Sequence, residues 1–242
     1  MKYRSLSAVA GLFLVFGATS ASASPVTLSY DGSDVQWGNA KPVRLAYGNN
    51  QRMDVSAGAF HMKDQDDNSL ITWCLDLFGS LTNNILYETT DAPFLGHKID
   101  GTRLNKIQAL FDTNYANVDT NVKSNSAGFQ LALWELLYEE GTEYRVDNAS
   151  DDRGTFYVDQ HVNGAVDMAN IYLSNIAKDV AGKIFDLTFY DAKNGDYQDL
   201  VSASEIPNNN TPAVPLPATV WLLGGGLATL FGIGRRKKAV AA

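Results

Sequence analysis

The sequence predicts an α+β fold in which antiparallel strands, first and last in the folded body, pack with a helical insert. Three observations predict it. Short strand-like segments separated by Gly, Asn and Asp turns run from Pro25 to about Glu88. The spacing of apolar residues then changes to the helical period between Leu104 and Ala177. Two further strand-like segments follow before a polar linker, so the chain is expected to return to a sheet.

The early strands are recognised by β-branched and aromatic residues between turn residues. Four segments have this character, namely 26–30, 43–47, 59–62 and 70–75. The two late segments are 184–190 and 199–203.

Three helices are expected between these groups of strands. The first carries its apolar residues at Leu104, Ile107, Leu110 and Phe111. The second spans 126–140, with Ser124 or Asn125 as candidate N-cap. In the third, apolar residues recur three and four positions apart from 165 to 177, so that one face is buried.

The two ends of the chain have the character of export signals. Residues 1–23 combine a basic start, a short apolar run and the small residues Ala21, Ser22 and Ala23, which together predict a secretory signal peptide. The expected organisation is a signal peptide over 1–23, a folded domain over 24–204, a linker over 205–213 and a C-terminal segment over 214–242.

The C-terminal segment predicts a short membrane helix that is followed by basic residues. An apolar stretch runs from Val220 to Ile233, and the 16 residues from Ala218 to Ile233 span only about 24 Å as a helix, against about 30 Å of hydrocarbon. The basic cluster that starts at Arg235 is expected to stay on the cytoplasmic side, which leaves the acidic body outside. A marginal helix of this kind favours a transient anchor over a permanent one.

The proline motif and the basic cluster resemble the PEP-CTERM sorting signal of Gram-negative bacteria, in its VPLPA variant. The residues that carry the resemblance are Val214, Pro215, Leu216, Pro217 and Ala218, followed by Arg235 and Arg236. The resemblance implies recognition by an exosortase after the secretion machinery has delivered the chain to the inner membrane. Cleavage near the proline motif would then release the protein to the cell surface, the extracellular matrix or a biofilm. The alternative is a plain single-pass anchor.

Charge and cysteine content exclude several classes of function. The basic ends hold six of the 19 Lys and Arg residues, so the body between them is strongly acidic and repels nucleic acid. A single cysteine rules out an internal disulfide framework, and no His and Cys spacing predicts a metal site. Neither a cofactor nor a metal is expected.

The single cysteine, Cys74, lies in an apolar segment, and a second motif follows at 129–136. There, Gln130 and Trp134 stand four residues apart and so share one face of a helix. A buried glutamine needs a partner, because an unpaired amide costs about 1–3 kcal/mol. A hydrogen bond or a covalent bond would satisfy it.

These two motifs resemble the thioester domains of bacterial surface adhesins. In that family a cysteine in an apolar strand is joined to a glutamine in a helix with the pattern Gln-x-Ala-aliphatic-Trp, which Gln130 to Trp134 matches. The resemblance implies a cross-link between Cys74 and Gln130. The aromatic residues expected to keep water from it are Trp73, Phe78, Phe129 and Trp134.

The function that this resemblance implies is covalent adhesion. The sulfur attacks the glutamine carbonyl, ammonia leaves, and the thioester later reacts with a nucleophile, such as an amine, on a target surface. Because each molecule reacts once, the protein is not expected to be an enzyme. Asp76 and Glu135 are candidates to assist bond formation.

Other interpretations stay open at this point. In one interpretation, Cys74 is an inert core residue. In another, it is the nucleophile of a cysteine hydrolase that uses His61, His97 or His161. Residues 64–68 begin like a calcium loop and then depart from it, so a solvated turn is favoured. The main alternative function is a non-reactive structural protein of the extracellular polymer, sorted by an exosortase.

Overall fold

The computed structural model describes the folded body in eight stretches. These are residues 25–31, 41–48, 51–90, 99–147, 154–159, 164–176, 182–193 and 196–207. The chain divides into two compact units, Met1–Glu205 and Ile206–Ala242. The predicted signal peptide and the predicted membrane helix of the sorting segment lie outside the described residues. Within those residues, no helix has the length and apolar character needed to cross a bilayer.

Six antiparallel strands close into a barrel in the order β1-β4-β5-β9-β8-β6. Their bounds are β1 Pro25–Tyr30, β4 Phe60–Lys63, β5 Ser69–Cys74, β6 Ile85–Thr90, β8 Phe185–Ala192 and β9 Leu200–Glu205. The barrel therefore joins strands from the first half of the body to the last strand, because β5 pairs with β9 from Thr72 to Cys74. This pairing brings the end of β5 next to the segment that precedes β9.

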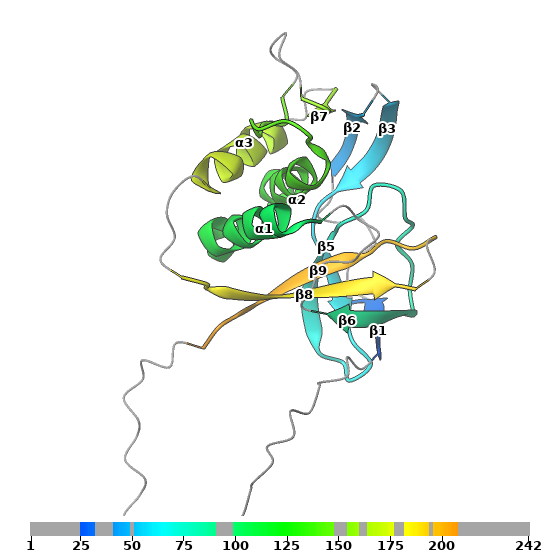
Figure 1. The fold of residues 1–242 in the computed structure, drawn as a ribbon. Coiled ribbons are helices and arrows are strands. Elements are labelled where there is room, and N and C mark those ends of the chain that lie inside the picture. Colours follow the sequence, from blue (N-terminus) through cyan, green and yellow to red (C-terminus); the bar gives the residue numbers. More distant parts are fainter. Residues whose placement is uncertain are drawn as a thin grey trace, which may run out of the picture. The chain divides into compact units, whose positions relative to one another are not determined.

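A second, three-stranded sheet has the order β3-β2-β7. It consists of β2 Lys41–Tyr47, β3 Gln51–Ala57 and β7 Phe156–Val158. In Figure 1 this sheet lies beside one end of the helices, while β8 and β9 run across the other side of them.

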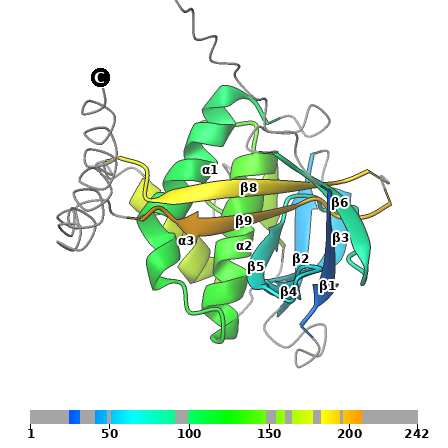
Figure 2. The ribbon, with the colours of Figure 1, turned by 90° about the horizontal axis from the view of Figure 1, so that it is seen from below.

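Three α-helices among the described residues form the layer between these sheets. They are α1 Gly101–Asn114, α2 Lys123–Tyr138 and α3 Ala165–Ile176. Figures 1 and 2 agree that β8 and β9 cover one side of this layer. The Asp112 carboxylate of α1 accepts hydrogen bonds from the backbone N–H groups of Ile184 and Phe185, which ties α1 to the start of β8.

Helix α2 is the centre of the core. Every residue from Ser126 to Leu137 is buried, because α1, α3 and the β2-β3-β7 sheet all pack against it. Gly128 permits the closest approach to α3, since a Cβ at this position would lie 2.6 Å from the Cβ of Met168. A helix that is buried on all sides must pair its polar side chains, and α2 carries two large ones, Gln130 and Glu135.

The predicted mixed fold with antiparallel strands is confirmed, with two differences in detail. Strands β3, β6 and β7 were not predicted as separate elements, since β3 and β6 are rich in polar residues and β7 has only three residues. The candidate caps of the second helix were wrong: α2 begins at Lys123, and Val122 occupies the N-cap without a side-chain hydrogen bond. In contrast, α1 is capped by Asp100, which accepts from the backbone N–H of Arg103.

Residues 64–68 form the turn between β4 and β5. The Asp64 carboxylate accepts hydrogen bonds from the backbone N–H groups of Asp66 and Asn68 and from the Asn68 side chain. These hydrogen bonds lower the pKa of Asp64. The interpretation of this segment as a solvated turn is confirmed.

Candidate functional site

The site is built around Cys74, the last residue of β5. Its side chain is buried, and burial raises the pKa of the thiol well above its ordinary value. A neutral, buried thiol is the opposite of the thiolate that a cysteine hydrolase needs. The only histidine in the described residues, His61, is paired with Ile71 in the β4–β5 ladder, whereas His97 and His161 lie outside those residues.

The structure brings Gln130 to Cys74, but to its backbone. The Cys74 N–H donates to Gln130 Oε1 at 2.9 Å, and Gln130 Nε2 donates to the Cys74 carbonyl oxygen at 2.8 Å. This pair of hydrogen bonds joins α2 to the end of β5. It also satisfies both ends of a side-chain amide that is fully buried.

The sulfur itself contacts another glutamine, Gln198. The Cys74 thiol donates to Gln198 Oε1, with 2.7 Å between sulfur and oxygen. Gln198 Nε2 donates to the backbone carbonyl of Asp76 at 3.1 Å, which orients the amide with its oxygen toward the sulfur. The side-chain amide nearest to the thiol in this network is therefore that of Gln198. Gln198 was not among the site residues predicted from the sequence.

Gln198 is held in place by the segment that follows β5. Its backbone N–H donates to Ser80 O, and Ser80 N donates to Asp196 O, so residues 80 and 197 form a parallel bridge. Gly79 permits this approach, because a Cβ there would lie only 2.5 Å from the backbone nitrogen of Gln198.

Two polar side chains, those of Asp76 and Tyr138, hold the stretch that follows Cys74. Asp76 Oδ2 accepts from the Asp199 N–H at 2.8 Å, and the Leu75 N–H donates to Asp199 O. The Tyr138 hydroxyl, from the end of α2, accepts from the Leu77 N–H and donates to Leu75 O. The stretch after Cys74 is thus fixed from both α2 and the segment before β9.

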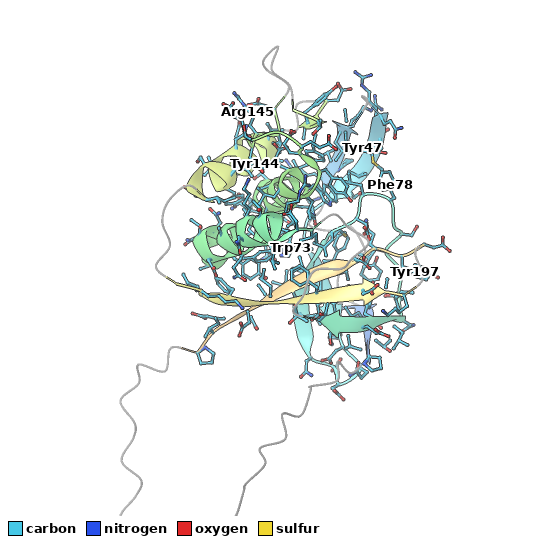
Figure 3. All side chains as sticks on the ribbon, viewed as in Figure 1. Tyr47, Trp73, Phe78, Tyr144, Arg145 and Tyr197 are labelled. Atoms are coloured by element: carbon cyan, nitrogen blue, oxygen red, sulfur yellow. The ribbon has the colours of Figure 1, made fainter. Side chains whose placement is uncertain are left out.

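Of the four aromatic residues expected to protect the site, three are buried. Trp73, Phe129 and Trp134 are at most 1% exposed, and the Trp73 and Phe129 rings lie 4.6 Å apart. Phe78 differs from these three, because it is 64% exposed. It follows the end of β5 in a surface segment, where its ring contacts Tyr47 edge to face. Figure 3 labels both side chains in this region of the molecule.

The two acids named as candidate helpers lie in different places. The backbone carbonyl of Asp76 accepts a hydrogen bond from the Gln198 side chain, and its carboxylate accepts one from the Asp199 N–H. Glu135 is turned toward the segment after α2, where its carboxyl accepts from the Arg145 N–H at 2.8 Å. Its position therefore gives no support for a role in bond formation.

Two pockets adjoin the site. One, of about 430 Å³, has Tyr47, Leu75, Asp76, Phe78 and Tyr138 in its wall. The other, of about 260 Å³, is lined by residues on both sides of Gln198 and again by Asp76 and Phe78. A molecule in either pocket would be close to the chain segments that carry Cys74 and Gln198.

Comparison with known families identifies the C-terminal segment. Residues 213–238 match the model of the PEP-CTERM protein-sorting motif. The match includes all seven predicted sorting residues, Val214 to Ala218 and Arg235 and Arg236, which lie outside the described part of the structure. A motif of this kind implies processing by an exosortase and indicates an exported protein. No curated protein matches the sequence.

Among solved structures, the chain is similar to domains of surface adhesins. The N-terminal thioester domain of a surface protein from Clostridium perfringens is 13% identical, with a TM-score of 0.43, over 76% of this chain and 100% of that domain. The N-terminal domain of the Streptococcus pyogenes pilus tip adhesin Cpa is 12% identical, with a TM-score of 0.45, over 78% and 97%. The corresponding values for the thioester domain of the S. pyogenes fibronectin-binding protein SfbI are 12%, 0.44, 78% and 97%. The case for a thioester in this chain depends on its own residues.

Proposed function

We propose that this chain is an exported surface protein that forms an internal thioester between Cys74 and Gln198 and then binds covalently to a nucleophile outside the cell. The observation that carries the proposal is the 2.7 Å contact between the Cys74 sulfur and Gln198 Oε1. In this contact the carbonyl carbon of the amide is within reach of a buried nucleophile.

The reaction is a transfer of the Gln198 acyl group from nitrogen to sulfur. The Cys74 sulfur forms a bond to Gln198 Cδ, the bond from Cδ to Nε2 breaks, and nitrogen leaves as ammonia with the proton that the thiol loses. Burial also protects the product. A thioester that is enclosed by the core is protected from hydrolysis until a target reaches it.

In this proposal Gln130 positions the nucleophile. Its two hydrogen bonds fix the backbone of Cys74, and both of its amide atoms are already used there. The predicted cross-link between Cys74 and Gln130 would require these two bonds to break. The arrangement favours Gln198 as the acyl partner and Gln130 as a positioning residue.

The adjoining pockets suit the approach of a target. Asp76 and Phe78 line both of them, so a nucleophile that enters would meet a carboxylate and an exposed aromatic ring next to the bond. An amine is the favoured nucleophile, because its cationic form is attracted to the acidic body. The target bond consumes the thioester, so the protein acts once and is not a turnover enzyme.

The sorting motif at the C-terminal end supports a location outside the cell for this chemistry. The secretion machinery would remove residues 1–23, and the inner membrane would hold the C-terminal helix until an exosortase cleaves near the proline motif. The protein would then reach the cell surface or the extracellular matrix, including a biofilm.

Intact mass measurement tests the proposal. The purified body should have lost one ammonia relative to its sequence, and methylamine should add one amine and release one thiol. Peptide mapping should place the methylamide on Gln198. A wild-type protein with the full sequence mass and one freely titrating thiol would refute the thioester and favour the non-reactive structural protein.

Three variants separate the partners. Cys74→Ala and Gln198→Ala should each abolish the loss of ammonia, because one of the two bonded atoms is gone. Gln130→Ala should leave some thioester but should lower stability, since a buried pair of hydrogen bonds is lost. If the methylamide maps to Gln130, and Gln198→Ala still loses ammonia, the original pairing of Cys74 with Gln130 is correct.

A further inference from the structure

The Tyr87 hydroxyl is buried in the barrel and has no hydrogen-bond partner among the described residues. Tyr87 lies on β6, and its ring contacts that of Tyr190 edge to face. Buried hydroxyls are nearly always paired, so an unpaired one in a well-packed core calls for an explanation.

The position of Tyr87 relates it to the Cys74 site. Tyr87 pairs with Ala192 across β6 and β8, and the Ala192 N–H donates to the Asp199 side chain. Asp199 in turn accepts from the Leu75 N–H through its own carbonyl. Three successive contacts, from Tyr87 to Ala192, from Ala192 to Asp199 and from Asp199 to Leu75, therefore join Tyr87 to the residue after Cys74.

The electrostatics agree with this placement. Burial raises the pKa of Tyr87, and the charges of Cys74, Asp199, Tyr30 and Asp76 raise it further. The hydroxyl therefore keeps its proton at neutral pH and remains a hydrogen-bond donor. It is a neutral hydrogen-bond donor that interacts electrostatically with Cys74.

We propose that the Tyr87 hydroxyl donates a hydrogen bond to the carbonyl oxygen of Gln198 as the thioester forms and when a nucleophile later attacks it. This inference depends on the proposed function. When sulfur bonds to Cδ, the electron pair of the carbonyl moves onto Oε1, and it returns when the bond to Nε2 breaks and ammonia leaves. A donor aimed at that oxygen stabilises the charged intermediate.

The change in partners of Oε1 explains why Tyr87 is unpaired before the reaction. In the thiol state Oε1 accepts from the Cys74 thiol. Bond formation removes that donor, because the sulfur loses its proton and becomes bonded to carbon. The oxygen then needs a new donor at the moment when its charge increases, and the Tyr87 hydroxyl supplies it.

Other donors near the site are already engaged or come from another side. The Tyr138 hydroxyl is used by the backbone of Leu75 and Leu77. The Trp134 indole N–H is also unpaired among the described residues. Trp134 belongs to α2 and lies one turn beyond Gln130. Gln130 binds the backbone of Cys74 and not its sulfur.

The test is Tyr87→Phe, with Tyr172→Phe as a matched control. Both substitutions remove one buried hydroxyl that has no partner among the described residues, but Tyr172 belongs to α3. We expect Tyr87→Phe to keep the melting temperature and to slow ammonia loss and methylamine attack about 100-fold. Tyr172→Phe should react at the wild-type rate.

A spectroscopic measurement separates this role from a structural one. With carbonyl-¹³C-labelled glutamine, the difference infrared spectrum before and after methylamine isolates the thioester carbonyl band. Loss of a donor should move this band to higher frequency in Tyr87→Phe and leave it in place in Tyr172→Phe. Wild-type rates and an unshifted band in Tyr87→Phe would overturn the inference, while the thioester itself would still stand. Absence of a thioester in the wild-type protein would instead refute the proposed function.

Discussion

At the scale of single residues, the contact between Cys74 and Gln198 depends on how closely two backbones approach. Gly79 lies against the backbone of Tyr197 and Gln198, where an added Cβ has no room. The side chain of Gln198 is then oriented by Asp76 and Cys74. A side chain held in this way has lost its freedom before the reaction starts, which lowers the barrier to attack.

Gly79→Ala should therefore impair the reaction. The new Cβ would force the backbone near Gln198 to move, and a displacement of about 1 Å can cost about 100-fold in rate. We also expect a loss of about 1–3 kcal/mol in the free energy of unfolding, as for other overpacked sites. The measurements are the rate of ammonia loss by intact mass and the urea unfolding curve.

Gly101→Ala is the matched control for this prediction. Gly101 is exposed at the start of α1, and an added Cβ there meets nothing within 4 Å. This variant should form the thioester like the wild type. If Gly79→Ala also did so at the wild-type rate, the close approach would have no part in placing Gln198.

At the scale of elements, α2 serves both the core and the site. One end of the buried stretch packs on α3 through Gly128, Gln130 reaches β5, and Tyr138 holds the segment beyond Cys74. The same helix buries a carboxyl group, Glu135, whose Oε2 has no partner among the described residues. Burial raises the pKa of Glu135 to about 9, so the carboxyl is neutral at pH 7.

This buried carboxyl predicts how stability depends on pH. Its pKa is higher in the folded state, at about 9, than its ordinary value of 4.5, so between these values the folded state holds a proton that the unfolded state has lost. This contribution to stability is fully present below pH 4.5 and is lost as the pH rises toward 9. The loss is at most about 1.4 kcal/mol per pH unit.

The measurement is the free energy of unfolding between pH 5 and pH 9 of two proteins, Cys74→Ala alone and Cys74→Ala combined with Glu135→Gln. The Cys74→Ala substitution removes the thioester chemistry from both. Glutamine is neutral at every pH and keeps an oxygen for the Arg145 N–H, so this variant should lose less stability as the pH rises. Parallel curves for the two proteins would show that Glu135 does not bind the proton.

At the scale of the whole molecule, the acidic body lies between two basic ends in the sequence. Only the body carries the residues of the proposed site, and the C-terminal segment carries the sorting motif at 213–238. Removal of both ends would leave a body with a strong negative charge. Such a charge favours solubility and attracts cationic targets.

Processing is the prediction at this scale. Protein recovered outside the cell should lack residues 1–23 and the segment beyond about Pro217, so it should not contain the basic cluster from Arg235 to Lys238. Terminal peptide mapping by mass spectrometry measures both ends. Replacement of Pro215 and Pro217 by alanine should leave the tail attached. Mature wild-type protein that keeps the basic tail in the inner membrane would favour a plain anchor.

The properties that are local in the chain could be predicted from its residues alone. The mixed fold with antiparallel strands, the three helices and the sorting motif follow from periodicity and from motifs within about 30 residues, and all were predicted. The predicted importance of Gln130 was also local, since its place on a buried helix demanded a partner. Its partner, however, is the backbone of Cys74.

Only the tertiary structure decided which group meets the sulfur. Gln198 lies 124 residues from Cys74, just before a strand, where no periodic pattern distinguishes it from other polar residues. Closure of the barrel pairs β5 with β9 and places the two side by side. The physical reason is that strand pairing depends on register and packing across the whole body, and neither is encoded within a short window of sequence.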